Sequence, residues 1–336
     1  MKAILKKLIE EQTLTATEAT EAMTLIMNGE ATQAQLGAFI TALRLTGETP
    51  EIIAACADVM RAHATPIPCS DPNAIDIVGT GGDGAHTFNI STTAAFVIAG
   101  AGVTVAKHGS YGVSSRCGSA NVLDELGINL AYSPEQMATC LEQIGIAFLF
   151  APALHPAMKH VVGPRKELGV WSLFNILGPL CNPAAVQRGL TGVFKPELLP
   201  IVAEACQQLN VQHQLIVHGE DGLDEITTTT ATQLIEVKEG HTRAFQFHPN
   251  EWDLPTATPA DLTGGEPAQN AAITRAILTG ELTGPKRDIV LVNAAFTLYT
   301  AGKANTPQEG LSLAEESIAS GNATAKLDAL AAASTR

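Results

Sequence analysis

Three loops of this sequence carry residues whose types and spacing could do chemistry. The first reads G-T-G-G-D-G over residues 79–84, follows an apolar stretch, and precedes a helix-like segment that begins near Ser91. Glycines let backbone N–H groups approach an anion closely, and a helix N-terminus adds partial positive charge. The loop therefore predicts a phosphate site, although a tight turn followed by an N-capping Ser91 would give the same pattern.

This first loop also matches the G-x-G-x-x-G fingerprint of dinucleotide-binding proteins. That fold places an acid at the end of the next strand to bind a ribose hydroxyl, whereas here the next strand ends in Lys107 and His108. No Gly-Lys-Ser/Thr follows, so a Walker A loop is excluded as well. Asp83 would repel a bare phosphate, and it fits better beside ribose hydroxyls or a metal-neutralised ligand.

The second loop, K-H-G-S-Y-G-V-S-S-R-C-G-S over residues 107–119, follows the next expected strand. Lys107 offers a point charge, and Ser114, Ser115 and Ser119 offer hydroxyl donors within a flexible backbone. Taken alone, the segment could be a solvated loop. Two glycine-rich loops after successive strands together predict a diphosphate ligand.

The third loop, E-D-G-L-D-E-I over residues 220–226, is acidic and follows the apolar stretch Q-L-I-V-H-G. Magnesium takes oxygen ligands, and proteins commonly supply one or two carboxylates while phosphate and water supply the rest. Asp224 and Glu225 are therefore the candidate metal pair. A solvated acidic turn is the alternative.

Other chemically active side chains give weaker signals. His155 and His160 are five residues apart, which does not place both on one helix face toward a metal, and the six cysteines contain no C-x-x-C pair. We therefore expect no zinc site and reduced thiols. His155 before Pro156 could start a helix or contact a substrate, and Arg165 could bind a carboxylate through its planar fork or lie on the surface.

The elements around these loops predict an α/β fold. Short apolar runs that end at the loops are typical of buried parallel strands, with helical patterns between them, and ligands in such folds collect beyond the carboxyl ends of the strands. Residues 1–70 show helical periodicity with start signals at Thr15, Thr32 and Thr49. We expect a small all-helical N-terminal domain over residues 1–70, with a returning segment near 165–180. A large α/β domain with a mostly parallel central sheet flanked by helices should follow over residues 71–336.

Composition and charge narrow the class of protein. The 336 residues are 46% hydrophobic and 16% charged, as in globular proteins, and the formal net charge of −14 disfavours nucleic acid and anionic membranes as partners. The uncharged run over residues 91–106 is too short for a membrane span and is broken by Gly100 and Gly102, so it predicts a helix, a turn and a buried strand. Lys6 and Lys7 interrupt the apolar stretch that a signal peptide needs, and a cytoplasmic location is expected.

These motifs, in this order, resemble those of the anthranilate phosphoribosyltransferases over nearly the whole chain. The resemblance rests on D-I-V-G-T-G-G-D-G, N-I-S-T, K-H-G, V-S-S-x-x-G-S-A, H-P-A-M-K-H, R-K-E-L-G, F-N-I-L-G-P-L-x-N-P and G-L-D-E-I. It implies a fold similar to that of the pyrimidine nucleoside phosphorylases. The implied activity is transfer of the 5-phosphoribosyl group from phosphoribosyl pyrophosphate (PRPP) to the amine of anthranilate, with release of pyrophosphate, in tryptophan biosynthesis.

The resemblance also implies residue roles. It places PRPP on Gly79, Gly82, Asp83, Thr87, Asn89, Ile90, Ser91, Thr92, Lys107, Ser114, Ser115 and Ser119. It places anthranilate on Gly79, Ser110, His155 and Arg165. It implies two Mg²⁺ ions per active site on Ser91, Asp224 and Glu225, and a homodimer formed through the helical domain. His108 is the nearest candidate for the proton acceptor.

The chain departs from the family pattern at three positions. Ser110 and Tyr111 stand where the family usually has asparagine and arginine, and Trp171 stands where an arginine or another polar residue is common. Ser110 offers one hydroxyl in place of a carboxamide, so a different aromatic acceptor is one alternative. A non-catalytic nucleic-acid-binding paralogue and a nucleoside phosphorylase are the others.

Overall fold

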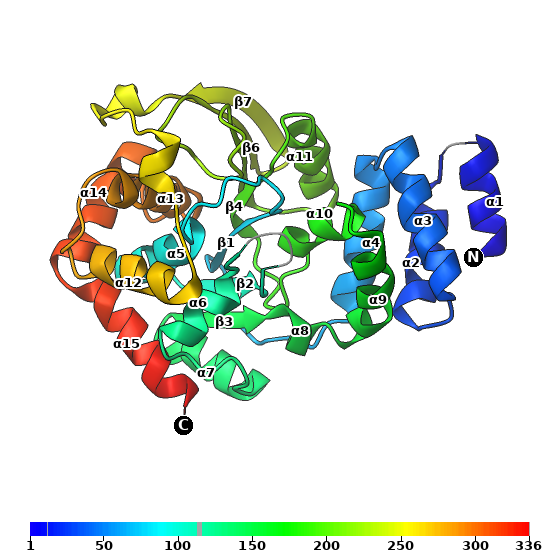
Figure 1. Cartoon of the computed structure of the whole chain (residues 1–336), viewed down its shortest axis with the longest axis horizontal. Coiled ribbons are helices and arrows are strands. Elements are labelled where there is room, and N and C mark those ends of the chain that lie inside the picture. The colour runs from blue at the N-terminus through cyan, green and yellow to red at the C-terminus, as the bar shows by residue number, and fades with distance from the viewer. Residues whose placement is uncertain (12, 113–115, 336) are drawn as a thin grey trace.

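The structure is a computed structural model that describes residues 1–11, 13–112 and 116–335. Figure 1 shows a bundle of helices on one side of a larger body built around a central sheet. The bundle opens the chain with helices α1 (Lys2–Glu11), α2 (Ala16–Met27), α3 (Gln33–Thr46) and α4 (Pro50–Ala62). Helix α9 (Lys159–Leu168) packs on α2 and α3, and α10 (Leu173–Leu180) packs on α3 and α4. The expected domain boundaries themselves stay a prediction.

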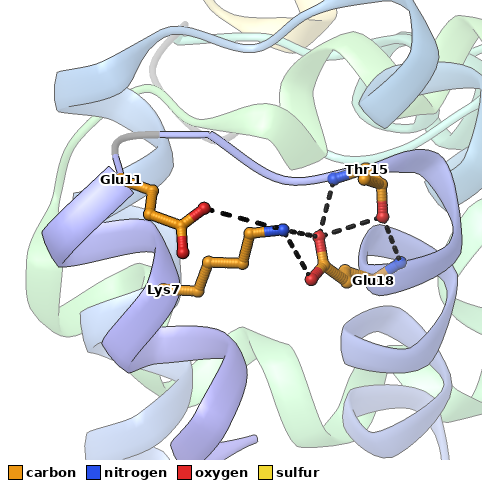
Figure 2. Close-up of polar contacts among 4 residues, drawn as sticks. All are labelled: Lys7, Glu11, Thr15 and Glu18. Carbon is orange, nitrogen blue, oxygen red and sulfur yellow. Dashed lines mark hydrogen bonds and ion pairs between the residues drawn. The ribbon is translucent and has the colours of Figure 1, made fainter.

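The N-terminal helices begin where their capping residues predict. Thr15 accepts a hydrogen bond from the backbone N–H of Glu18 at 3.3 Å, and the Glu18 carboxylate accepts one from the backbone N–H of Thr15 at 2.8 Å. Lys7 of α1 donates to the same carboxylate at 2.8 Å and lies 3.9 Å from Glu11 (Figure 2). The capping box therefore also ties α1 to the start of α2.

Among the described residues, seven strands form one sheet in the order β3-β2-β1-β4-β5-β6-β7. The first five strands are parallel to one another, and β6 and β7 are antiparallel. The parallel strands are β1 (Ile75–Gly79), β2 (Val105–Gly109), β3 (Ile146–Phe150), β4 (Arg188–Gly192) and β5 (His213–Gly219). Because they run the same way, their carboxyl ends meet at one edge of the sheet.

The hairpin of β6 (Thr232–Lys238) and β7 (His241–Phe247) was not expected from the sequence. Its two-residue turn is Glu239-Gly240, with φ angles of 49° and 79°. Positive φ at both positions is typical of the turns that join antiparallel strands. The hairpin extends the sheet beyond β5 with two antiparallel strands.

Helices cover both faces of the sheet. On one side α5 (Ile90–Gly100) is buried almost all round and contacts the sheet and the C-terminal helices. Those helices are α12 (Pro267–Leu278), α13 (Pro285–Thr300), α14 (Pro307–Ala319) and α15 (Asn322–Ser334). On the other side α11 (Leu198–Gln208) joins the sheet to the bundle through its contacts with α4. The expected helix, turn and strand over residues 91–106 are confirmed as α5, a turn and β2.

Short helices fill further connections between these elements. They are α6 (Ser119–Glu125), α7 (Pro134–Gln143), α8 (Ala151–Leu154) and the 3₁₀ turns Pro156–Met158, Pro249–Trp252 and Pro259–Leu262. No helix within the described residues is long and apolar enough to cross a membrane.

Candidate active site

The acidic loop and the first glycine-rich loop lie against each other at the carboxyl edge of the sheet. The backbone N–H of Gly81 donates to Oδ2 of Asp224 at 2.7 Å. The backbone N–H of Ser91, in the first turn of α5, donates to Oε1 of Glu225 at 3.2 Å. Two segments more than 130 residues apart therefore form one site, as their positions after β1 and β5 predict.

The carboxylates of this site are held in a way that disfavours negative charge. Burial and the nearby charge of Asp83 raise the pKa of Asp224 to about 7. Burial and the charge of Asp224 raise the pKa of Glu225 to about 8, although Lys107 and the Ser91 N–H act in the opposite direction. Neighbouring buried carboxylates with raised pKa values are typical of a site that a cation completes.

The donor set fits magnesium. Within the described residues no group of three or more His, Cys, Asp or Glu side chains could enclose a metal ion. The protein thus offers a carboxylate pair and leaves the other positions to ligand oxygens and water, as magnesium sites on phosphate substrates usually do. Oxygen ligands of this kind favour a hard cation over one that prefers nitrogen or sulfur.

The raised pKa values predict how the stability of the metal-free chain depends on pH. Free Asp and Glu titrate at about pH 4, so between about pH 5 and pH 8 the folded chain retains protons on Asp224 and Glu225 that the unfolded chain has released. Stability falls with pH wherever the folded state binds more protons. We expect the Tm in EDTA to fall by about 3 °C or more over this range, since about 1 kcal/mol shifts the Tm of a large domain by about 2–4 °C.

Thermal denaturation with and without Mg²⁺ and pyrophosphate measures this effect. Mg²⁺ with pyrophosphate should reduce the fall in Tm with rising pH, because the cation takes the place of the retained protons. The Asp224→Asn, Glu225→Gln double variant serves as the control and should show a flatter profile. An equal fall in Tm in the wild type and the double variant would contradict the assignment of the pH dependence to Asp224 and Glu225.

Two glycines make room for Asp224. A Cβ atom built on Gly79 would collide with Oδ2 of Asp224, and one built on Gly192 would collide with its backbone carbonyl. Gly79 and Gly192 are paired across β1 and β4 at the end of the sheet. The acidic loop therefore rests directly on the last residues of two strands, where no side chain fits.

Gly79→Ala should displace the Asp224 carboxylate without removing any charge. Because a misplaced metal ligand commonly costs 10–100-fold, we expect the Mg²⁺ concentration for half-maximal rate to rise at least about 10-fold. A Mg²⁺ titration of the initial rate is the measurement. Gly37→Ala, in helix α3 with open space around the position, is the matched control, and equal effects of both changes would contradict this role.

The start of α5 differs in detail from what the sequence predicts. The N-cap is Asn89, and Ser91 lies within the first turn instead of capping it. The Asn89 amide donates to the backbone carbonyl of Cys117 at 3.1 Å, and its Oδ1 accepts from Asn270 of α12 at 3.0 Å. Asn89 thus joins the first loop to the second. Ile90 and Thr92 are buried, and the backbone N–H of Ile90 donates to the carbonyl of Phe88 at 2.8 Å.

Lys107 lies deeper than a loop cation would. Its ammonium is buried and donates to the carbonyl of Ile77 at 2.7 Å. Burial lowers its pKa, while the charges of Asp76 and Glu225 raise it. The sequence analysis placed Lys107 as a point charge where the expected strand meets the second loop, and in the structure it lies within β2, which continues to Gly109 and is paired on both sides. Lys107 therefore offsets the negative charge of Glu225 from inside the protein.

The remaining predicted donor-site residues flank these loops. Thr87 forms an isolated antiparallel bridge with Thr263, and Ser119 begins α6 and donates to the carbonyl of Ser110 at 3.2 Å. Gly82 and Asp83 lie in the first loop, where Gly82 has a φ of 93° that favours glycine. Ser114 and Ser115 lie outside the described residues.

The candidate proton acceptor, His108, and the predicted anthranilate contact, His155, are two buried histidines. The rings of His108 and His155 are 5.1 Å apart, and Nδ1 of His108 lies 3.1 Å from the carbonyl oxygen of Gly178. Burial lowers the pKa of His108 to about 3 and that of His155 to about 4. Within the described chain, Nε2 of each ring is buried without a hydrogen-bond partner. Both rings are therefore neutral near pH 7 and can bind a polar ligand group.

Arg165 presents a guanidinium that no carboxylate neutralises in the part of the chain that the structure describes. Its Nη2 donates to Oδ1 of Asn175 at 3.2 Å, and its guanidinium lies 5.6 Å from the ring centroid of Phe174. Burial lowers its pKa. A half-buried cation without a counter-charge is suited to an anionic ligand group. Asn175 was not singled out from the sequence, where it reads as an ordinary residue of a helix.

Two of the three departures from the family pattern, Tyr111 and Trp171, make side-chain contacts beside these loops. Tyr111 donates to Asp124 at 3.1 Å and packs edge-on against Phe150, with ring centroids 5.2 Å apart. The indole of Trp171 packs 4.9 Å from the Phe194 ring and lies close enough to Gly82 that a Cβ there would come within 3.2 Å. The Tyr111 side chain thus points toward Asp124, and the Trp171 side chain packs against Gly82 of the first glycine-rich loop.

Comparisons with known proteins agree with this geometry. Residues 71–324 match the glycosyl transferase family, a/b domain, and residues 2–64 match the helical bundle domain of the same family. The anthranilate phosphoribosyltransferase of Moorella thermoacetica is 52% identical over 99% of this chain and 98% of that protein. The enzyme of the same name from Acetivibrio thermocellus is 49% identical over 98% of this chain and 95% of that protein.

Solved structures of anthranilate phosphoribosyltransferases also resemble this chain over nearly its whole length. Anthranilate phosphoribosyltransferase from Thermus thermophilus superimposes with a TM-score of 0.94 at 43% identity, over 99% of each chain. The enzyme from Saccharomyces cerevisiae in complex with PRPP and Mg gives a TM-score of 0.92 at 30% identity, over 99% of this chain and 97% of that one. These relatives support the expected family over the nucleic-acid-binding and alternative-acceptor interpretations. The chain therefore belongs to the glycosyl transferase family and, within it, to the anthranilate phosphoribosyltransferases.

Proposed function

We propose that the chain transfers the 5-phosphoribosyl group of PRPP to the amine of anthranilate, giving N-(5-phosphoribosyl)anthranilate and pyrophosphate. The observation that carries the proposal is the carboxylate pair of half-buried Asp224 and buried Glu225, joined to the first glycine-rich loop and to the first turn of α5. A site of this kind binds an anion through backbone N–H groups and a cation through carboxylates at the same place. Magnesium diphosphate chemistry needs both.

The donor would lie along the edge of the sheet. In this proposal the first loop, the start of α5 and the second loop bind PRPP through Gly79, Gly82, Asp83, Thr87, Asn89, Ile90, Ser91, Thr92, Lys107, Ser114, Ser115 and Ser119. Ser91, Asp224 and Glu225 would hold two Mg²⁺ ions, which neutralise the pyrophosphate as its bond to ribose C1 breaks. The chain itself would position the two substrates and stabilise the charge that develops, and these two effects would supply most of the rate enhancement.

The acceptor would bind between Arg165 and the histidine pair. Arg165 would grip the anthranilate carboxylate, and Gly79, Ser110 and His155 would line the remainder of the ring site. The amine of anthranilate is neutral near pH 7 and needs no base before it attacks C1. Attack from the side opposite pyrophosphate inverts the configuration at C1. The pKa of about 3 makes His108 too weak a base to keep the released proton, so a contact with the acceptor fits it better than proton storage.

A homodimer formed through the helical domain is also part of the proposal. Four large apolar side chains are exposed on the bundle or directly after α9: Ile9 at 66%, Leu45 at 83%, Val162 at 57% and Val170 at 53%. Large apolar side chains left exposed are candidates for burial in a protein interface. The six unpaired cysteines suit a reducing compartment and support a cytoplasmic location.

One assay tests the proposed reaction. The protein, PRPP and Mg²⁺ are mixed with anthranilate, and the loss of anthranilate fluorescence is followed. Nucleoside with inorganic phosphate, and labelled DNA, are the parallel controls. We expect fluorescence loss that requires both PRPP and Mg²⁺, and phosphorolysis without PRPP would contradict the proposal.

A further inference from the structure

Asn293 of α13 is a buried polar residue that the reaction described above does not use. Its side chain is 0% exposed, in the middle of a helix where asparagine is unfavourable unless it bonds to something. Helix α13 lies against the sheet, in contact with β4 and β5 (Figure 1). A buried carboxamide in such a place needs partners for its N–H and C=O groups.

Those partners belong to the acidic loop. Oδ1 of Asn293 accepts from the backbone N–H of Ile226 at 3.0 Å, and Nδ2 donates to the backbone carbonyl of Ile226 at 2.8 Å. A third bond from Nδ2 to the carbonyl of Ile289, at 2.9 Å, fixes the carboxamide to its own helix. Ile226 directly follows Glu225, so one side chain binds both backbone groups of the residue beside the carboxylate pair.

The acidic loop is therefore held on both sides of Glu225. On one side Asp224 rests on Gly79 and Gly192 and accepts from Gly81. On the other side the paired bonds of Asn293 fix both the position and the rotation of the Ile226 peptide groups. Glu225 lies between these two contacts, so its backbone is fixed on both sides.

We infer that Asn293 is a positioning residue for the metal-binding carboxylates, and that it holds Glu225 in the geometry that the metal requires. The inference rests on the proposed metal site. Asparagine suits this role because its carboxamide donates and accepts at once, which matches the N–H and C=O groups of a single residue. Metal ligands commonly depend on such outer partners, whose loss costs about 10–100-fold in metal affinity.

Calorimetric titration with PRPP, with and without Mg²⁺, tests this without measuring turnover. The ratio of the two dissociation constants gives the part of PRPP affinity that depends on metal. Asn293→Leu keeps the approximate size and removes both bonds to Ile226 as well as the bond to Ile289, and we expect it to reduce this ratio at least about 10-fold. Asn293→Asp, which when protonated still donates one bond and accepts one, should fall between Leu and the wild type.

Thr300→Val is the matched control. Thr300 is also 0% exposed on α13, and its hydroxyl bonds to the carbonyl of Thr297 within the same helix. It should lower the Tm while leaving the ratio within about twofold of the wild-type value. An Asn293→Leu chain that folds and keeps the wild-type ratio would overturn the inference.

Two further results separate this inference from the metal assignment. A ratio that does not change in Asp224→Asn would remove the metal assignment, and the role of Asn293 with it. If the Asn293 variants do not fold, hydrogen exchange of the Ile226 amide in the wild-type protein tests the inference instead. We expect slow exchange both with and without Mg²⁺ and PRPP, whereas rapid exchange in the metal-free protein would show that the loop is not held.

Discussion

The Asp224→Asn, Glu225→Gln double variant is expected to lose at least about 1,000-fold in kcat/KM while it keeps its fold. Preorganised charges and metal ions at a developing leaving group each contribute several kcal/mol, and about 1.4 kcal/mol corresponds to tenfold in rate. The substitutions preserve shape and remove the two carboxylates whose pKa values are raised to about 7 and 8. Removing repulsion between buried carboxylates should also leave the metal-free chain at least as stable as the wild type near pH 8.

The measurement is a Mg²⁺ titration of the initial rate together with the Tm at pH 8. Glu220→Gln is the matched control, because Glu220 belongs to the same acidic loop but lies exposed and accepts from Gln246 on β7 at 2.8 Å. It should keep activity and Mg²⁺ dependence within about threefold, as expected for a surface charge. Wild-type turnover by the double variant at limiting Mg²⁺ would contradict the metal site.

Arg165→Ala is expected to raise the anthranilate KM by about 10–100-fold and to leave the PRPP KM within about threefold. A hydrogen bond to a charged group contributes about 1.5–3 kcal/mol, which corresponds to this range. The separation follows from position, because Arg165 lies on α9 beside Phe174 and Asn175, whereas the metal pair lies after β5. Arg165→Lys should recover a small part of the loss, since an ammonium cannot bind a carboxylate through two parallel donors.

Steady-state kinetics with each substrate varied in turn measures the split. Lys166→Ala is the neighbouring control, because Lys166 is exposed on the same helix. Equal rises in the two KM values would show that Arg165 acts on the whole site and not on the acceptor carboxylate.

Local signals allowed much of the fold to be predicted. Capping residues located the starts of α2, α3 and α4, and short apolar runs located the strands that lead into the three loops, which are β1, β2 and β5. Both kinds of signal are local, since a cap concerns one turn of backbone and a buried parallel strand is apolar along its length. The β6–β7 hairpin was missed because its strands are half exposed and its Glu-Gly turn is a weaker signal than Asn-Gly.

The loops that form the site could be predicted from the sequence, whereas the side-chain contacts between them could not. The three loops could be located because glycines, serines and acids interrupt apolar runs, and their meeting at one edge follows from parallel strands. The depth of Lys107, the orientation of Tyr111 toward Asp124 and the hold of Asn293 on Ile226 depend on packing between distant segments. A buried asparagine in a helix is unusual, but its partner 67 residues away is set by the tertiary fold.

A crystal soaked with PRPP and Mn²⁺, with anomalous data collected for manganese, shows whether Asp224 and Glu225 bind the metal that accompanies PRPP. We expect PRPP along the first glycine-rich loop and the start of α5, with manganese bound directly to carboxylate oxygens of Asp224 and Glu225. Strand ends that remain empty, or a metal that binds PRPP without touching either carboxylate, would contradict this expectation.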